Sequence, residues 1–188
     1  PILNFVSSYT LPSITIDIIF SSCYNIYYIY NRINKTMRPL IHLNYPINKD
    51  ILLLESDKAR KTAKPWHHKN EVTAGPNWLV SYYTSDYIDN IMKELNIIGS
   101  PRFFFQQPHF HLKPHRDYGT QCAVNIILNG TTPINIEGKE YVYSQALVNV
   151  QREHSIKTDN EERIMLKFSI KDKSFEEVLK DMNYVVSS

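Results

Sequence analysis

Residues 118–143 read YGTQCAVNIILNGTTPINIEGKEYVY, and this stretch decides the fold. Short runs rich in Val, Ile and Tyr alternate in it with the turn pairs Asn129-Gly130 and Glu137-Gly138. Val, Ile and Tyr fit the pleated surface of a sheet, and an Asn-Gly pair suits a tight hairpin turn. The stretch therefore predicts short antiparallel strands in close succession.

Similar runs continue on both sides of this stretch. The seven runs that we expect to form strands are 102–107, 109–113, 122–128, 134–136, 139–143, 146–150 and 163–170. In the last run, one face carries Ile164, Leu166, Phe168 and Ile170, and the other carries Arg163, Met165, Lys167 and Ser169. So many short strands predict a mainly β domain with flanking helices, a double-stranded β-helix of the jelly-roll, cupin-like type.

Helical patterns lie on either side of the strand region. Residues 50–61 have the composition of a helix, and apolar residues recur at helical spacing between Ser85 and Leu95. We expect these helices to pack on the outer face of the sheet. An extended piece is expected at 40–45, a loop rich in breakers at 64–77 and a strand at 78–83. A last short helix at 174–182 is expected to lie on the surface.

Composition limits the class of protein. With 188 residues, 43% of them hydrophobic and 21% charged, the chain suits one soluble globular domain. Residues 1–36 differ from the rest in their low charge, so we divide the chain into a leader, 1–36, and a single domain, 37–188. The net charge of +2, with no long basic run, carries no strong nucleic-acid signal.

Cysteine usage and the leader bear on the compartment. The only cysteines, Cys23 and Cys122, make neither a disulfide framework nor a four-cysteine zinc site, so we expect a reducing compartment and a cytoplasmic location. Residues 11–30 are long enough to cross a bilayer, but Asp17, Asn25 and several hydroxyl groups argue against a membrane anchor.

The strongest chemical signal is the triplet His115-Arg116-Asp117, followed later by His154. In an extended segment, residues two apart project to the same side, so His115 and Asp117 can reach one metal ion together. His154 would complete a face of two histidines and one carboxylate. Such a face leaves three neighbouring positions open on an octahedral ion, which suits iron(II) that binds a 2-oxo acid and dioxygen.

Arg163 follows His154 by nine residues, after a polar stretch that we expect to turn the chain. A planar guanidinium can hold a carboxylate through two parallel hydrogen bonds, so we assign Arg163 to the distal carboxylate of 2-oxoglutarate. The alternative is a salt bridge between Arg163 and Glu161 or Glu162.

On these residues the chain resembles the Fe(II)/2-oxoglutarate-dependent oxygenase superfamily, and within it the aspartyl/asparaginyl β-hydroxylase-like group. The resemblance covers roughly residues 103–170 and implies iron(II), the co-substrate 2-oxoglutarate, dioxygen, and hydroxylation of a substrate such as an amino acid or a peptidyl side chain.

The chain departs from one member of that group, the vertebrate aspartyl hydroxylase, which lacks the carboxylate ligand that Asp117 offers here. Where that hydroxylase has an arginine and a histidine for the co-substrate, this chain has Asn125 and Ile127. We expect Asn125 to be the second contact to 2-oxoglutarate, because its amide can donate to a carboxylate.

Other readings remain open. His109 and His111 are expected at the surface or on the substrate side rather than as ligands. His67 and His68 are expected in a solvated loop, with a loop that folds over the cavity mouth as the alternative. A non-catalytic cupin-type module that binds a metal or a small ligand is the rival from another class, and a cupin enzyme without 2-oxoglutarate is a third possibility. Cupin sites usually offer three histidines and a glutamate, and no second histidine closely follows His115. The substrate and the oligomeric state are not specified by the sequence.

Overall fold

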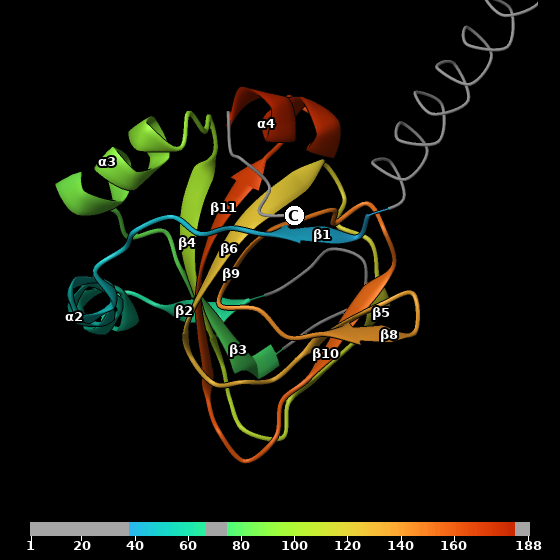
Figure 1. Cartoon of the computed structure of the whole chain (residues 1–188). Coiled ribbons are helices and arrows are strands. Elements are labelled where there is room, and N and C mark those ends of the chain that lie inside the picture. The colour runs from blue at the N-terminus through green and yellow to red at the C-terminus, as the bar shows by residue number, and fades with distance from the viewer. Residues whose placement is uncertain (1–37, 67–74, 183–188) are drawn as a thin grey trace, which may run out of the picture. The chain divides into compact units, whose positions relative to one another are not determined.

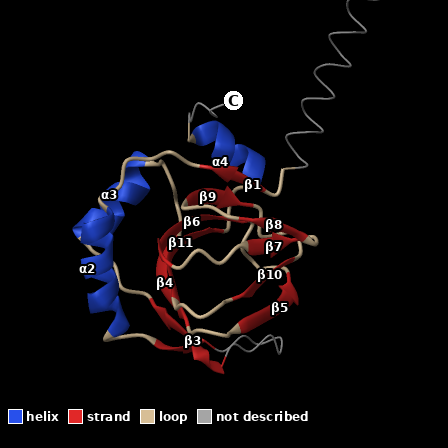
Figure 2. Ribbon diagram, turned by 60° about the horizontal axis from the view of Figure 1, so that its bottom comes forward, coloured by secondary structure: helices blue, strands red, loops and turns tan. Residues whose placement is uncertain are grey.

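Two antiparallel sheets face each other in the computed structural model, which describes residues 38–66 and 75–182. Figure 2 looks into the barrel between them. The larger sheet has the strand order β1-β9-β6-β11-β4-β3-β2 and the smaller one β5-β10-β7-β8. The predicted double-stranded β-helix with flanking helices is therefore confirmed.

The strands are short, as their sequence predicts. Those of the larger sheet are β1 (Leu40–His42), β2 (Lys64–Trp66), β3 (Gly75–Ser81), β4 (Ser100–Gln106), β6 (Cys122–Asn129), β9 (Gln145–Val148) and β11 (Arg163–Ile170). Those of the smaller sheet are β5 (His111–His115), β7 (Ile134–Ile136), β8 (Lys139–Tyr141) and β10 (His154–Lys157).

Strand β11 lies at the centre of the larger sheet, where it pairs with β4 and β6. Its two faces behave as their alternation predicts. Leu166, Phe168 and Ile170 belong to the apolar core on the outer face of the sheet. Met165, on the other face, belongs to a second apolar cluster that also takes residues from the smaller sheet. Arg163 and Lys167 share the face of Met165, so β11 presents two cations to the space between the sheets.

Three helices cover the outer core: α2 (Lys49–Arg60), α3 (Asp86–Glu94) and α4 (Phe175–Asp181). In Figures 1 and 2, α2 and α3 lie beside the larger sheet, outside the barrel, as expected. Ser85 stands at the N-cap of α3, but its side chain makes no capping hydrogen bond to that helix. The last helix was expected on the surface, but α4 is only partly exposed. Its residues Phe175, Val178 and Leu179 are buried in the outer core.

Two strands, β2 and β10, were not expected, and β3 begins earlier than expected. Pro65 predicts a loop at residues 64–66, but these residues form the edge strand β2, where a missing N–H need not weaken the sheet. Strand β3 likewise begins at Gly75, inside the expected loop. The sequence does not predict strand β10, because its four residues, HSIK, are few and include one strongly apolar residue, Ile156, although their burial alternates in the structure.

Some expectations concern residues outside the described ranges. The leader 1–36, its low-charge segment 11–30 and the loop histidines His67 and His68 lie outside these ranges. The division of the chain into a leader and a domain, 37–188, therefore stays a prediction. Among the described residues, no helix is long and apolar enough to cross a membrane.

Candidate metal centre

The predicted histidines lie directly opposite each other in the smaller sheet. Strands β5 and β10 pair antiparallel, with His115 opposite His154 and Leu112 opposite Ile156. Leu112 and His115 are three residues apart on β5, whereas their partners Ile156 and His154 are two residues apart on β10. This extra residue on β5 is a β-bulge. The extra residue changes the phase of β5, so that Leu112 is buried between the sheets and His115 still turns toward His154. The two rings lie 4.4 Å apart between centroids.

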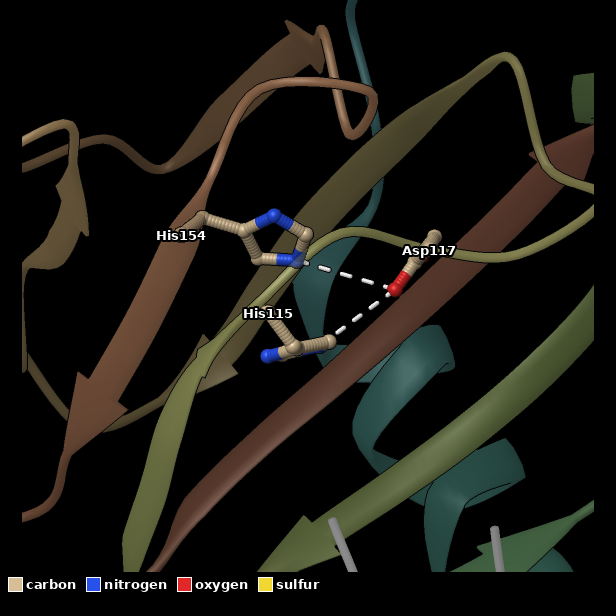
Figure 3. A group of neighbouring side chains, drawn as sticks. All are labelled: His115, Asp117 and His154. Atoms are coloured by element: carbon tan, nitrogen blue, oxygen red, sulfur yellow. Dashed lines mark ion pairs between the residues drawn. The ribbon is translucent and has the colours of Figure 1, made fainter. Parts of the chain in front are cut away.

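Asp117 reaches the same point from the loop that follows β5 (Figure 3). Its backbone N–H donates to the carbonyl of Val150 at 3.0 Å, and its own carbonyl accepts from the Gln151 amide at 2.8 Å. These bonds fix the loop. The Oδ1 atom of Asp117 lies 3.4 Å from Nε2 of His115 and 3.6 Å from Nε2 of His154. One ligand atom from each of the three residues thus lies within 4.8 Å of the other two.

Backbone contacts select the tautomer of both histidines. Nδ1 of His115 lies 2.9 Å from the carbonyl oxygen of Lys113, and Nδ1 of His154 lies 2.9 Å from that of Arg152. A carbonyl oxygen only accepts, so each Nδ1 donates, and in the neutral form of each ring the lone pair is on Nε2, the atom that faces Asp117. Three atoms that can each donate a lone pair therefore converge, and a metal ion between them would be bound by all three.

The second carboxylate oxygen of Asp117 has a different partner. Lys167 of β11 places its Nζ 2.5 Å from Oδ2, and both side chains are largely buried. Burial by itself would raise the pKa of Asp117, but the Lys167 ammonium beside it outweighs burial and holds this pKa well below its usual range. Asp117 is therefore an anion under all ordinary conditions, as a metal ligand must be.

Protonation of His154 should cost stability. Burial, with a smaller contribution from nearby positive charge, lowers the pKa of His154 from 6.5 to about 4. Since the folded-state pKa lies below the unfolded one, this stability is complete above pH 6.5 and is lost as the pH falls toward about 4. We expect the metal-free protein to lose roughly 1–3 kcal/mol between pH 7 and pH 4.5 from this residue.

Urea unfolding of the EDTA-treated protein at the two pH values measures this loss. His154→Gln should show a shallower pH dependence than the parent, and His42→Gln, at an exposed position, should match the parent. Equal slopes for the parent and His154→Gln would contradict the buried neutral imidazole.

A narrow cavity of about 30 Å³ adjoins the three residues. Its polar lining comprises His115, Asp117, His154, Gln106, Asn125 and Lys167, and its apolar lining comprises Trp78, Leu112, Ile134, Val150, Ile156 and Met165. Asn125, the expected second co-substrate contact, thus lies in the same cavity as the metal-binding group. Its Nδ2 donates to the hydroxyl of Tyr143 at 3.0 Å, while its Oδ1 is buried without a hydrogen-bond partner.

Arg163 lies next to this lining rather than in it. Its guanidinium donates to Gln106 Oε1 at 2.7 Å and to the Tyr143 hydroxyl at 3.1 Å, and its Nε is buried without a partner. The residue is 1% exposed. None of the ion pairs in the described part of the chain includes Arg163, and Glu162 instead pairs with Arg60 at 2.6 Å. A cation buried without a counter-ion is costly, so this position is suited to an anion that arrives from outside.

Three residues of the site had no assigned role in the sequence interpretation. The alternation of β11 predicts that Lys167 shares the face of Arg163 but predicts no partner for it, and the pattern marks Gln106 and Tyr143 only as strand residues. The alternation of β11 could have identified Lys167, since it stands four residues after Arg163 on the same face. No signal marks Tyr143, because its meeting with Arg163 depends on how the sheets close. His109 and His111 are exposed and do not belong to the metal-binding group, as expected.

Comparison with known proteins identifies the fold. No family model and no curated protein matches the chain. Among solved structures, a Pseudomonas putida prolyl-4-hydroxylase aligns with a TM-score of 0.55 and 11% identity, over 72% of this chain and 94% of its own. The viral collagen prolyl hydroxylase of Paramecium bursaria Chlorella virus-1, solved as a 2OG complex, aligns with a TM-score of 0.52 and 10% identity, over 71% and 96%. At these identities the likeness shows the fold: the described domain shares the fold of these prolyl hydroxylases.

Proposed function

We propose that this domain is a non-haem iron(II) dioxygenase that couples the oxidative decarboxylation of 2-oxoglutarate to the hydroxylation of a substrate. His115, Asp117 and His154 would hold the iron, and Arg163 would anchor the far carboxylate of the co-substrate. The observation that carries the proposal is the buried Arg163 guanidinium, which forms no ion pair with any residue that the structure describes and lies next to a cavity lined by two histidines and an aspartate.

The three ligands suit iron(II) by their chemistry. Two imidazoles and one carboxylate converge from one side of the cavity, and no fourth His, Cys, Asp or Glu joins this group in the described residues. A structural zinc site would normally be closed by four protein ligands. Three ligands from one side leave positions for a chelating acid and for dioxygen, which is the arrangement of the two-histidine, one-carboxylate oxygenases.

The surroundings of Arg163 suit a carboxylate that replaces neutral partners. Gln106 Oε1 accepts from Nη1 at 2.7 Å, and the Met165 sulfur lies 3.5 Å from the same nitrogen. A carboxylate that took their place would gain charge-assisted hydrogen bonds. Because a cavity of about 30 Å³ holds little more than a water molecule or two, entry of 2-oxoglutarate requires the side chains of Gln106 and Met165 to move. The amide of Asn125 would complete the polar end of the site.

When bound, iron(II), 2-oxoglutarate and dioxygen would supply the oxidising chemistry, with succinate and carbon dioxide as products. The protein's own residues bind, orient and exclude water. Leu112, Ile134 and Val150 give the cavity apolar walls, which keep solvent from the reacting atoms. Lys167 and the two backbone carbonyls of Lys113 and Arg152 hold the ligands in the orientation that binding needs.

We further propose that the substrate is a small molecule or a peptide with an oxidisable side chain, and that the protein acts in the cytoplasm. The two solved structures aligned above are prolyl hydroxylases, which favours a peptidyl side chain over a nucleobase. The aspartyl/asparaginyl β-hydroxylase-like group remains a hypothesis that rests on the resemblance between the sequences.

Two measurements test the proposed function against the cupin-type binding module. Anaerobic addition of iron(II) and then 2-oxoglutarate should produce a weak visible charge-transfer band, and admission of air should yield succinate even without the substrate. Lys157→Gln, an exposed change on β10, should behave like the parent. A folded protein that binds iron(II) but gives neither the band nor succinate would be a metal-binding module and not this oxygenase.

A further inference from the structure

The two oxygens of the Asp117 carboxylate face different partners. Oδ1 is the atom that lies 3.4 and 3.6 Å from the histidine Nε2 atoms, whereas Oδ2 accepts from Lys167 Nζ at 2.5 Å. Carboxylates bind metals through one oxygen or through both. As long as the ammonium holds Oδ2, only Oδ1 is free to bind a metal ion.

Lys167 is well placed to keep that hold. It stands in the centre of the larger sheet, opposite Arg102 of β4 and Asn125 of β6. Its side chain is 13% exposed and lines the cavity from the wall opposite the histidines' sheet. Asp117 is its only ion-pair partner among the described residues. An ammonium anchored on a central strand has little freedom to leave a buried carboxylate.

The charge balance of the cavity depends on this ion pair. The aspartate and the ammonium cancel, and the histidines are neutral ligands, so a bound divalent ion leaves a net charge of about +2. A chelating dianion neutralises that charge. Without the ammonium the net charge at the metal position, counted without Arg163, would be about +1. A dianion bound wholly at the metal, as oxalate would be, would then leave that position negative, which is unfavourable where water is excluded.

We propose that Lys167 is a positioning residue that restricts Asp117 to one metal-binding oxygen and thereby reserves a coordination position, and additional positive charge, for a chelating acid. This inference rests on the proposed metal-binding role of His115, Asp117 and His154. It predicts effects of opposite sign on two affinities. Loss of Lys167 should maintain or raise the affinity for the metal ion and should lower the affinity for the chelating acid.

Manganese(II) and oxalate are the probes for the test. Oxalate chelates through two adjacent carboxylates and has no distal carboxylate for Arg163, so it reports on the metal end of the site alone. Titration calorimetry on the full chain gives the manganese(II) affinity, and then the oxalate affinity of the manganese-loaded protein. In Lys167→Met, we expect manganese(II) to bind at least as tightly as in the parent, and oxalate to bind roughly tenfold to a hundredfold more weakly.

Conservative and matched variants separate positioning from support of the fold. Lys167→Arg keeps the charge and a donor for Oδ2, so it should recover most of the oxalate affinity. Lys157→Met, an exposed lysine on β10, should leave both affinities unchanged. If Lys167→Met does not fold, Lys167→Gln removes the charge and keeps a donor, and oxalate affinity should fall there as well.

The outcomes distinguish the two proposals. A parent protein that binds no manganese(II) would remove the metal site itself and with it the proposed function. A parent that binds both probes, with oxalate affinity unchanged in the Lys167 variants, would overturn the positioning role alone. A parallel fall of manganese(II) affinity, oxalate affinity and melting temperature would show that Lys167 merely supports the fold.

Discussion

Asp117→Ala should abolish specific binding of divalent metal, with an affinity loss of about a hundredfold or more. Asp117 is the only anionic ligand in the group, and removal of a first ligand should exceed the tenfold to hundredfold cost typical of the residues that support ligands. The change also leaves the Lys167 ammonium buried without its partner at 2.5 Å. That cation would then lie beside the metal position and repel the metal, which adds to the loss.

Calorimetric titration with manganese(II) measures this effect below the melting temperature of the variant. Asp117→Asn is the stricter test, since it keeps the size of the side chain and an oxygen but removes the charge. Asp159→Ala removes an exposed aspartate from the loop before β11 and should bind manganese(II) like the parent. Retention of parental manganese(II) affinity in Asp117→Asn would contradict the metal centre.

The strands and the histidine-aspartate group were predictable because both depend on local spacing. Alternation fixes the two faces of a strand such as β11 wherever it lies in the fold. The triplet His115-Arg116-Asp117 keeps two ligands close in any extended segment, so only His154 had to be found at long range. The structure brings it opposite His115 in the neighbouring strand.

The bulge in β5 and the edge strand β2 could not be read in the same way. In an ideal strand, residues two apart share a face, so His115 would share a face with Lys113. Leu112, three residues before His115, would lie on the opposite face. The register shift against β10 changes this, and it exists only when β10 is present as a partner. For β2, the proline argued locally against a strand, and only the position at the sheet edge removes the objection.

The environment of Arg163 also depends on tertiary structure. The sequence allowed a salt bridge with Glu162, but Arg60 of α2 binds that carboxylate through both of its terminal nitrogens, at 2.8 and 2.6 Å. Arg60 lies about a hundred residues away in the chain, so no local pattern could assign the pair. This distant pairing leaves Arg163 without a carboxylate partner among the described residues.

Arg163→Lys should weaken the binding of 2-oxoglutarate roughly tenfold to a hundredfold and leave manganese(II) affinity unchanged. A lysine keeps the positive charge but loses the planar, two-point grip of the guanidinium on a carboxylate. Replacement of a paired, charge-assisted contact by a single one costs about 1.5–3 kcal/mol. Arg163 does not belong to the metal-binding group, so the metal itself should not respond.

Oxalate makes this prediction specific to the distal carboxylate. It has no such group, so Arg163→Lys should bind oxalate as the parent does while its affinity for 2-oxoglutarate falls. Arg152→Lys is the matched control, because Arg152 forms a more exposed ion pair with Glu137 at 2.7 Å, and its change should affect neither ligand. If 2-oxoglutarate affinity stayed at the parental value, or if oxalate and manganese(II) binding fell together with it, Arg163 would be a structural residue. A fall in 2-oxoglutarate affinity alone would instead show that the buried guanidinium binds a ligand carboxylate. An arginine that only supported the fold would affect 2-oxoglutarate and oxalate equally, although the two acids differ in the distal carboxylate.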